Sequence, residues 1–184
     1  MSSSEQNDDI EIRFVTPSDA AGMLALKLAL DAETTFMMFE VGERRATVAD
    51  VWHEIQEHID SPNSTLIIAA SSDLIAGYVE AHGGAFNRTR HAALVTAGVR
   101  ASHAGQGLGS RLFQALLDWA DGAGIVRLEL TVMAHNRAAI GLYEKFGFER
   151  EGLRRCSVVV DGACVDEIAL ARVRPDFAGS TRNG

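Results

Sequence analysis

The 184-residue sequence has little of what several protein classes require. It has no apolar run near the roughly eighteen residues that span a bilayer. Residues 1–9 are polar and acidic, whereas a secretory signal begins basic and continues apolar. We therefore expect a cytoplasmic protein without membrane contact. Lysine and arginine total 17 against 25 aspartate and glutamate, and the formal charge of −8 disfavours non-specific binding to nucleic acid.

Side chains for metal and disulfide sites are also scarce. No two of the six histidines lie four residues apart, and no Cys-x-x-Cys motif is present, so we predict no metal site. Only two cysteines occur, and the Asp161-Gly162 pair between them predicts a hairpin turn. A regular ladder from this turn sets Cys156 opposite Glu167, several residues along the strands from Cys164. We therefore predict that the cysteines are not bonded.

The composition is that of one compact domain. With 47% hydrophobic residues, a chain of this length can bury a sizeable core. We place a single domain at 10–174, between flexible tails at 1–9 and 175–184.

Hydrophobic periodicity predicts four helices among seven strands. The predicted strands are at 10–15, 66–70, 74–81, 91–99 and 127–132, with a final hairpin over about 153–173. The predicted helices are at 17–30, behind Thr16 or Ser18, at 47–59, at 108–121, and after Asn136. The strands at 66–70, 74–81 and 91–99 form an antiparallel meander in this interpretation.

A glycine-rich segment joins the meander to the third helix. It reads V-R-A-S-H-A-G-Q-G-L-G-S-R-L from Val99 to Leu112. Glycine admits positive φ and close approach of backbone amides, and a helix N-terminus attracts anions, so the segment predicts a phosphate site. No lysine follows the glycines, which excludes a P-loop. A dinucleotide fingerprint is an alternative, since Glu129 lies about twenty positions on, but such a loop normally follows the first strand of a parallel unit.

A second segment, Asn136 to Phe148, reads N-R-A-A-I-G-L-Y-E-K-F-G-F, a short helix that Asn136 caps and Gly147 ends. With V-x-x-x-x-A-G-Q-G-L-G upstream, it closely resembles the paired motifs of the GNAT superfamily of acetyl-CoA-dependent N-acetyltransferases. The resemblance implies an α/β (α+β) GNAT fold, with a mixed, mostly antiparallel sheet of about seven strands and helices on both faces. The implied order is β-α-α-β-β-β-α-β-α-β-β.

The resemblance also implies where acetyl-CoA binds. In this family the strand ending near Val99 and the strand at 127–132 splay apart and admit the pantetheine arm, and the glycine loop holds the pyrophosphate. The expected cofactor contacts are Gly98, Val99, Ala101, Ala104, Gly105, Gln106, Gly107, Gly109, Ser110, Asn136, Ala139 and Tyr143. Ala104 departs from the arginine or glutamine usual in the family, so backbone amides carry more of the binding, with Arg111 or Lys145 as substitute cations.

Tyr143 is the expected general acid, because the family places a tyrosine hydroxyl near the departing thiolate. An ordinary pKa of about 10 keeps the phenol protonated at neutral pH. The alternative is a packing role. The base that deprotonates the amine is less determined by the sequence: His91, Glu33 and Glu80 are candidates, and a water chain with no dedicated base is another.

The segment from Glu33 to Arg45 is the expected acceptor pocket, with Glu33, Phe36 and Met37 as substrate contacts. A lid or a homodimer contact is the alternative. The sequence is similar to bacterial members that acetylate small amines, and we predict direct attack by an amino acid on acetyl-CoA in a ternary complex. A polyamine or a protein N-terminus is the alternative acceptor. A non-catalytic acetyl-CoA sensor and a dinucleotide oxidoreductase are the alternatives from other classes.

Overall fold

The computed structural model describes residues 10–177, and the predicted element order is confirmed. The strands are β1 (Glu11–Phe14), β2 (Thr65–Ala70), β3 (Ile75–Gly83), β4 (Ala92–Val99), β5 (Arg127–Met133), β6 (Glu149–Val160) and β7 (Ala163–Val173). The helices are α1 (Ala20–Glu33), α2 (Val48–Asp60), α3 (Leu108–Gly122) and α4 (Arg137–Lys145). The tail predicted at 1–9 and most of the one predicted at 175–184 lie outside the described residues.

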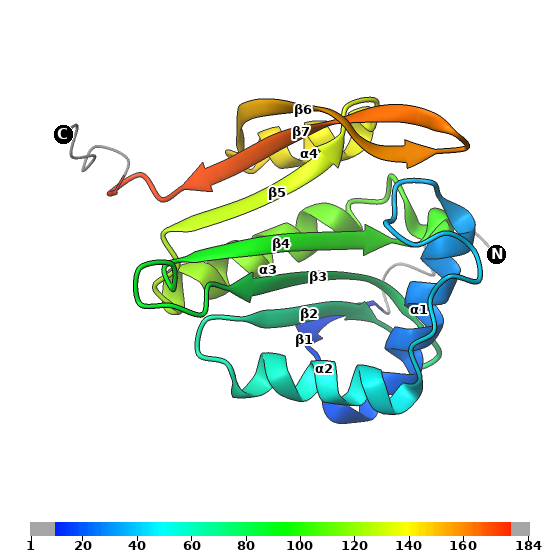
Figure 1. Ribbon diagram of the computed structural model, residues 1–184. Helices are drawn as coiled ribbons and strands as arrows, with labels where there is room; N and C mark the ends of the chain where they lie inside the picture. Colours follow the sequence, from blue (N-terminus) through cyan, green and yellow to red (C-terminus); the bar gives the residue numbers. More distant parts are fainter. Residues whose placement is uncertain (1–9, 178–184) are drawn as a thin grey trace.

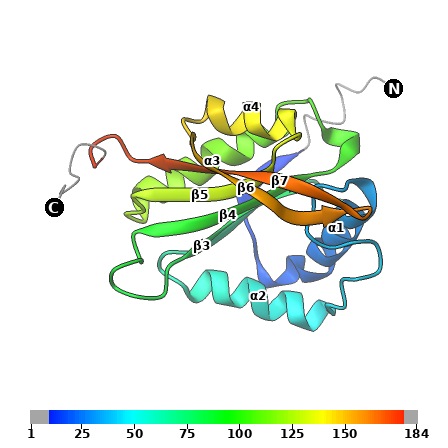
Figure 2. The ribbon, with the colours of Figure 1, turned by 45° about the horizontal axis from the view of Figure 1, so that its top comes forward.

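One seven-stranded sheet runs in the order β1-β2-β3-β4-β5-β7-β6, with α1 and α2 on one face and α3 and α4 on the other (Figures 1 and 2). Every neighbouring pair is antiparallel except β4 with β5, which is parallel. Two hydrophobic clusters hold the layers together, one under α3 around Phe113 and Leu116, the other under α1 and α2 around Met23 and Ile55. The mixed α+β fold expected from the resemblance is confirmed.

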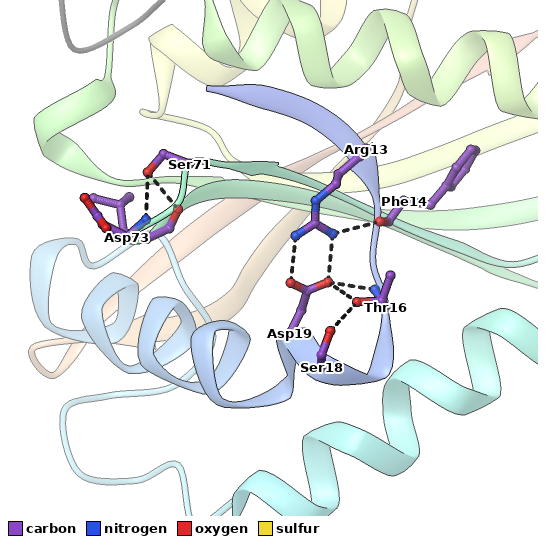
Figure 3. Close-up of polar contacts among 8 residues, drawn as sticks. Arg13, Phe14, Thr16, Ser18, Asp19, Ser71 and Asp73 are labelled. Carbon is purple, nitrogen blue, oxygen red and sulfur yellow. Dashed lines mark hydrogen bonds and ion pairs between the residues drawn. The ribbon is translucent and has the colours of Figure 1, made fainter. Parts of the chain in front are cut away.

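A network of hydrogen bonds joins β1 to the start of α1 (Figure 3). The Thr16 backbone N–H and hydroxyl donate to the Asp19 carboxylate at 2.7 and 2.8 Å, opening a short 3₁₀ turn that continues into α1. The Arg13 guanidinium donates to both oxygens of Asp19 at 2.8 Å. Figure 3 also shows the Ser71 hydroxyl accepting from the Asp73 N–H in the turn between β2 and β3.

The parallel pair β4 and β5 opens into a gap. Their ladder holds only from Ala92–Arg127 to Leu94–Glu129. Beyond that point β4 stays paired with β3 as far as Val99, while β5 stays paired with β7 as far as Met133. Figure 1 shows the two strands diverging toward the end of the sheet that bears α1. β4 and β5 are neighbours in the sheet, but they are separated at the end that lies beside the glycine loop.

The prediction for the cysteines is wrong. The ladder of β6 and β7 is regular next to the turn, but it shifts between Arg154 and Val158, so that three residues of β6 bulge opposite one residue of β7. The bulge holds Cys156 at a φ of 49°, with its N–H donating to the Asp166 carboxylate at 2.8 Å. It moves Cys156 toward the turn, where its Cα lies 4.7 Å from that of Cys164 and the two form a disulfide. The expectation failed because it assumed a regular register.

Within residues 10–177, no helix has both the length and the apolar character that crossing a membrane requires.

Candidate functional site

The three glycines of the loop have two different structural roles. Gly105 and Gly107 adopt φ values of 74° and 81°, in the left-handed region that side chains disfavour. A Cβ at either position would meet no atom within 4 Å, so the backbone conformation alone demands glycine there. At Gly109 a Cβ would lie 3.0 Å from the Leu142 side chain. The third glycine therefore allows α3 and α4 to approach closely.

The N-terminus of α3 offers a set of backbone donors. The first helical bond runs from the Arg111 N–H to the Gly107 carbonyl. The N–H groups of Leu108, Gly109 and Ser110 therefore have no carbonyl partner within the helix. Together with the helix dipole they form a site for an anion.

A lysine from α4 supplies positive charge at the same place. The Lys145 ammonium donates to the Ser110 hydroxyl at 3.1 Å. Arg111 has a different partner, since its guanidinium donates to the Ile10 carbonyl at 2.6 Å. Of the two cations considered for the missing side chain at Ala104, Lys145 is the one that lies beside Ser110.

Backbone groups of β4 line the gap in alternation. The Arg100 N–H donates to the Ala76 carbonyl, and the Ala92 carbonyl accepts from the Gly84 N–H, so even-numbered residues of β4 bond to β3. Odd-numbered residues turn their N–H and C=O groups the other way, toward β5. Val99 therefore directs its backbone groups into the gap. The backbone groups of Gly98 face β3.

Glu33 stabilises the end of β4. Its carboxylate accepts from the Ala101 N–H at 2.9 Å and from the Arg100 guanidinium at 2.7 Å. These two donors hold the pKa of Glu33 below its ordinary value. Ala101, a predicted cofactor contact, thus donates its N–H to Glu33, and the Ala104 N–H donates to the Ala101 carbonyl. Glu33 thereby connects α1 to the end of β4.

Tyr143 lies on α4 against the aromatic cluster under α3. Its ring centroid is 5.3 Å from that of Phe113 and 6.0 Å from that of Phe148. Burial raises the pKa of Tyr143 to about 12, which keeps the hydroxyl in its proton-donating form. Its hydroxyl makes no hydrogen bond to any residue in 10–177. The cap predicted for this helix is confirmed, since the Asn136 side chain accepts from the Ala139 N–H at 3.2 Å.

The other two base candidates lie away from the end of β4. His91 precedes the first residue of β4, about 26 Å along the strand from Val99. Glu80 is buried in β3 opposite Thr96, about 10 Å along the sheet from Val99. Burial opposes ionisation of Glu80, but His82 and Lys27 outweigh it and lower the pKa of Glu80.

The segment after α1 reaches the turn between β5 and α4. The Phe36 ring lies 5.2 Å from that of His135, and Met37 packs on the cluster under α1 beside Gly98. Next to this contact is a hollow lined by Ala134, His135, Arg137, Cys164, Val165 and Asp166. No sequence pattern points to this hollow, because its residues come from separate elements. Within residues 10–177 the Arg137 guanidinium has no hydrogen bond or ion pair.

A model of the acetyltransferase (GNAT) family matches residues 28–148, a range that includes both the glycine loop and α4. The chain belongs to this family.

Two curated relatives of the GNAT chain carry different acceptors in their names. It is 38% identical over 103 residues to the N-alpha-acetyltransferase RimI of Mycobacterium tuberculosis, covering 56% of this chain and 63% of that protein. It is 29% identical over 124 residues to the L-amino acid N-acetyltransferase AaaT of Escherichia coli, covering 66% of this chain and 76% of that protein. The aligned part thus spans less than two thirds of RimI.

Solved structures share the whole architecture. A GNAT-family acetyltransferase from Streptococcus pneumoniae superposes with a TM-score of 0.87 at 28% identity, covering 90% of this chain and 99% of that one. The structure of yncA from Salmonella typhimurium, solved with its cofactor acetyl-CoA, superposes with a TM-score of 0.82 at 18% identity, covering 94% and 98%. The second likeness shows the fold alone.

Proposed function

We propose that this GNAT protein transfers the acetyl group of acetyl-CoA to the primary amine of a small molecule, and that the acceptor is an amino acid. The gap between β4 and β5, opening directly beside the glycine loop and the free end of α3, carries the proposal. The gap exposes an unpaired strand edge to a pantetheine arm, and the helix end offers donors to a pyrophosphate.

The residues present fit acetyl-CoA. Val99 directs its backbone N–H and C=O groups into the gap. The backbone N–H groups of Gly109 and Ser110 lie in the first turn of α3 and have no carbonyl partner within the helix. Lys145 supplies the cation that Ala104 does not. We expect Lys145→Met to raise the KM for acetyl-CoA with little change in kcat, because a phosphate contact acts on binding rather than on the reacting atoms.

The chemistry needs two proton movements. The amine forms a C–N bond with the acetyl carbonyl carbon, and the C–S bond breaks. We assign Tyr143 to donate its phenol proton to the departing sulfur, because burial keeps that proton in place at neutral pH. Glu33 is engaged by two donors and His91 lies at the far end of β4, so we assign the proton lost by the amine to a water chain without a dedicated base.

The hollow beside Phe36 favours an acceptor that carries a carboxylate. Arg137 lines it without an ionic partner among residues 10–177, and a guanidinium binds carboxylates in a bidentate manner. The contact of Phe36 with His135 connects the segment after α1 to the turn before α4, which suits a compact acceptor better than a long peptide. AaaT, by its name, acts on L-amino acids.

Two experiments test the proposal. Acetyl-CoA should raise the melting temperature, whereas NAD and ATP should not, and equal stabilisation by NAD would contradict the cofactor. Release of free CoA thiol should then be followed with L-amino acids, polyamines and peptides that have free N-termini. Activity on peptides alone would favour the N-terminal alternative, and tight acetyl-CoA binding without thiol release would favour the sensor.

Arg137→Met sharpens the test of the acceptor. It should raise the KM for an L-amino acid but not for the matching amine that lacks the carboxylate. Arg88→Met, an exposed arginine in the loop before β4, is the control and should change neither. An equal effect of Arg137→Met on both acceptors would contradict carboxylate recognition. The homodimer and the cytoplasmic location expected from the sequence stay predictions.

A further inference from the structure

Three side chains with metal-binding atoms meet between α2 and β3, on the face of the sheet opposite α3. His58 belongs to the last turn of α2, and Glu80 and His82 alternate along β3, which places them on one face. Their ligand atoms all lie within 4.8 Å of one another. His82 Nε2 is 3.9 Å from Glu80 Oε2, and the two imidazole centroids are 4.3 Å apart. We call these three residues the His-Glu-His cluster.

Two buried atoms of the cluster, one in His58 and one in Glu80, carry lone pairs but accept no hydrogen bond from residues 10–177. His58 is 3% exposed and Glu80 is 8% exposed. His58 Nδ1 lies 2.9 Å from the Glu54 carbonyl, and since a carbonyl only accepts, Nδ1 carries the hydrogen and Nε2 carries a lone pair. Neither His58 Nε2 nor Glu80 Oε2 has a hydrogen-bond partner within residues 10–177. Buried polar atoms are rarely left in this state, so both atoms are available to a group that bonds to lone pairs.

Neighbouring cations already have other partners. Lys27 forms an ion pair with Glu54 at 2.5 Å, and Arg44 forms one with Asp31 at 2.6 Å. Within residues 10–177, the nearest basic groups to Glu80 that have no other ionic partner are the imidazoles of His82 and His58, and His82 Nε2 lies beyond hydrogen-bond distance at 3.9 Å.

We propose that the His-Glu-His cluster binds one divalent transition-metal ion, with zinc as the best fit. Two imidazole nitrogens and one carboxylate oxygen are the donor set that zinc accepts with three protein ligands, leaving a fourth position for water. The Glu54 carbonyl orients His58 from behind, as outer groups commonly do for metal-binding histidines. The side chain of His82 is 50% exposed, which gives an ion a path from solvent.

Metal binding requires a modest contraction. Ligand atoms about 2.1 Å from a tetrahedral ion lie about 3.4 Å from one another. Since the ligand atoms lie within 4.8 Å of one another, the cluster must tighten by at most about 1.4 Å. We assign most of this movement to His82, because its side chain is 50% exposed whereas His58 and Glu80 are buried.

The proposed metal site goes beyond acetyl transfer, because it lies about 10 Å along the sheet from Val99 and uses none of the groups assigned to that reaction. It also revises the expectation of no metal from sequence spacing. That expectation considered pairs four residues apart on a helix. Here the ligands combine strand spacing in β3 with a histidine twenty-two positions earlier.

The test measures metal binding directly. Tag-free full-length protein is treated with a chelator, and zinc is then titrated against a chromophoric competitor, with Co²⁺ absorption as a probe of coordination. We expect one zinc per chain. Glu80→Gln and His82→Ala should each weaken zinc binding at least tenfold, since loss of even an outer-shell partner costs 10- to 100-fold. His53→Ala removes an exposed histidine from the same helix and should leave the affinity unchanged.

His82→Ala is the decisive variant, because the half-exposed side chain can be removed without loss of the fold, which its melting temperature verifies. Failure of the wild type to bind zinc would overturn the proposal. So would equal zinc affinity in wild type, His82→Ala and Glu80→Gln. Since no acetyl transfer is measured, a protein that lacks acetyltransferase activity can still pass this test, and an active one can fail it.

Discussion

Replacing Gly107 with alanine tests whether the loop conformation itself holds the cofactor. Gly107 is the N-cap of α3 and has a φ of 81°. A Cβ there meets no atom within 4 Å, so Gly107→Ala creates no clash. Its whole cost is the left-handed backbone conformation, about 1–2 kcal/mol for a residue with a side chain.

The complex with acetyl-CoA carries this conformational cost, whichever conformation the loop adopts in the free protein. If the loop keeps its conformation in the free protein, folding stability falls. If the loop relaxes instead, the cost moves to binding, and acetyl-CoA affinity falls by about 5- to 30-fold. In both cases the bound state is destabilised by the same amount relative to the unfolded chain. For a domain of this size, the melting temperature at saturating acetyl-CoA should drop by about 2–8 °C.

The assay is thermal denaturation with and without saturating acetyl-CoA, combined with a Kd from calorimetry. Gly122→Ala is the matched control. It lies at the other end of α3, has no neighbour within 4 Å of a Cβ and does not adopt a positive φ. Alanine is the better helix former, so the control should melt at the same temperature or slightly higher. An unchanged melting temperature and Kd in Gly107→Ala would refute the argument that the loop must adopt this conformation.

Three further outcomes are expected. Tyr143→Phe should lower kcat by about 10²- to 10⁴-fold with an unchanged KM for acetyl-CoA, and full turnover would contradict its role as the acid. Cys156→Ser should cost about 2.5 kcal/mol in urea unfolding, from a disulfide to Cys164 that spans 8 residues, and an equal midpoint would argue against the bond. Arg13 lowers the pKa of Asp19 to about 2, so Asp19 stabilises the fold above about pH 4 and loses that effect as the pH falls through 2. The free energy of unfolding, measured between pH 2 and pH 6, should therefore change less with pH in Asp19→Asn than in the wild type. An equal pH dependence in the two proteins would disprove the coupling.

Local chemistry made much of this GNAT domain predictable. The Asn136 cap depends on groups three residues apart, and the glycine loop on the φ that each residue can adopt. Hydrophobic periodicity records which side of each element faces the core, so the order of the elements followed from it. The paired motifs then indicated the family, and with it the separation of β4 from β5.

Contacts between distant elements could not be read in this way. Residue type made Glu33 a candidate base, which stays a prediction, but only the approach of α1 to the end of β4 reveals its hydrogen bond with the Ala101 N–H. A single bulge in β6 reversed the prediction for Cys156 and Cys164, because the position of a bulge depends on how two strands pack, not on their turn.

The sequence by itself determined the element order, the glycine loop and the helix caps, because these depend on interactions within a few residues. Only the tertiary structure decided which side chains meet. It placed Lys145 beside Ser110 and brought His58 to Glu80 and His82. Such meetings depend on the register of strands and the depth of helix packing, which are properties of the whole sheet and its two covered faces.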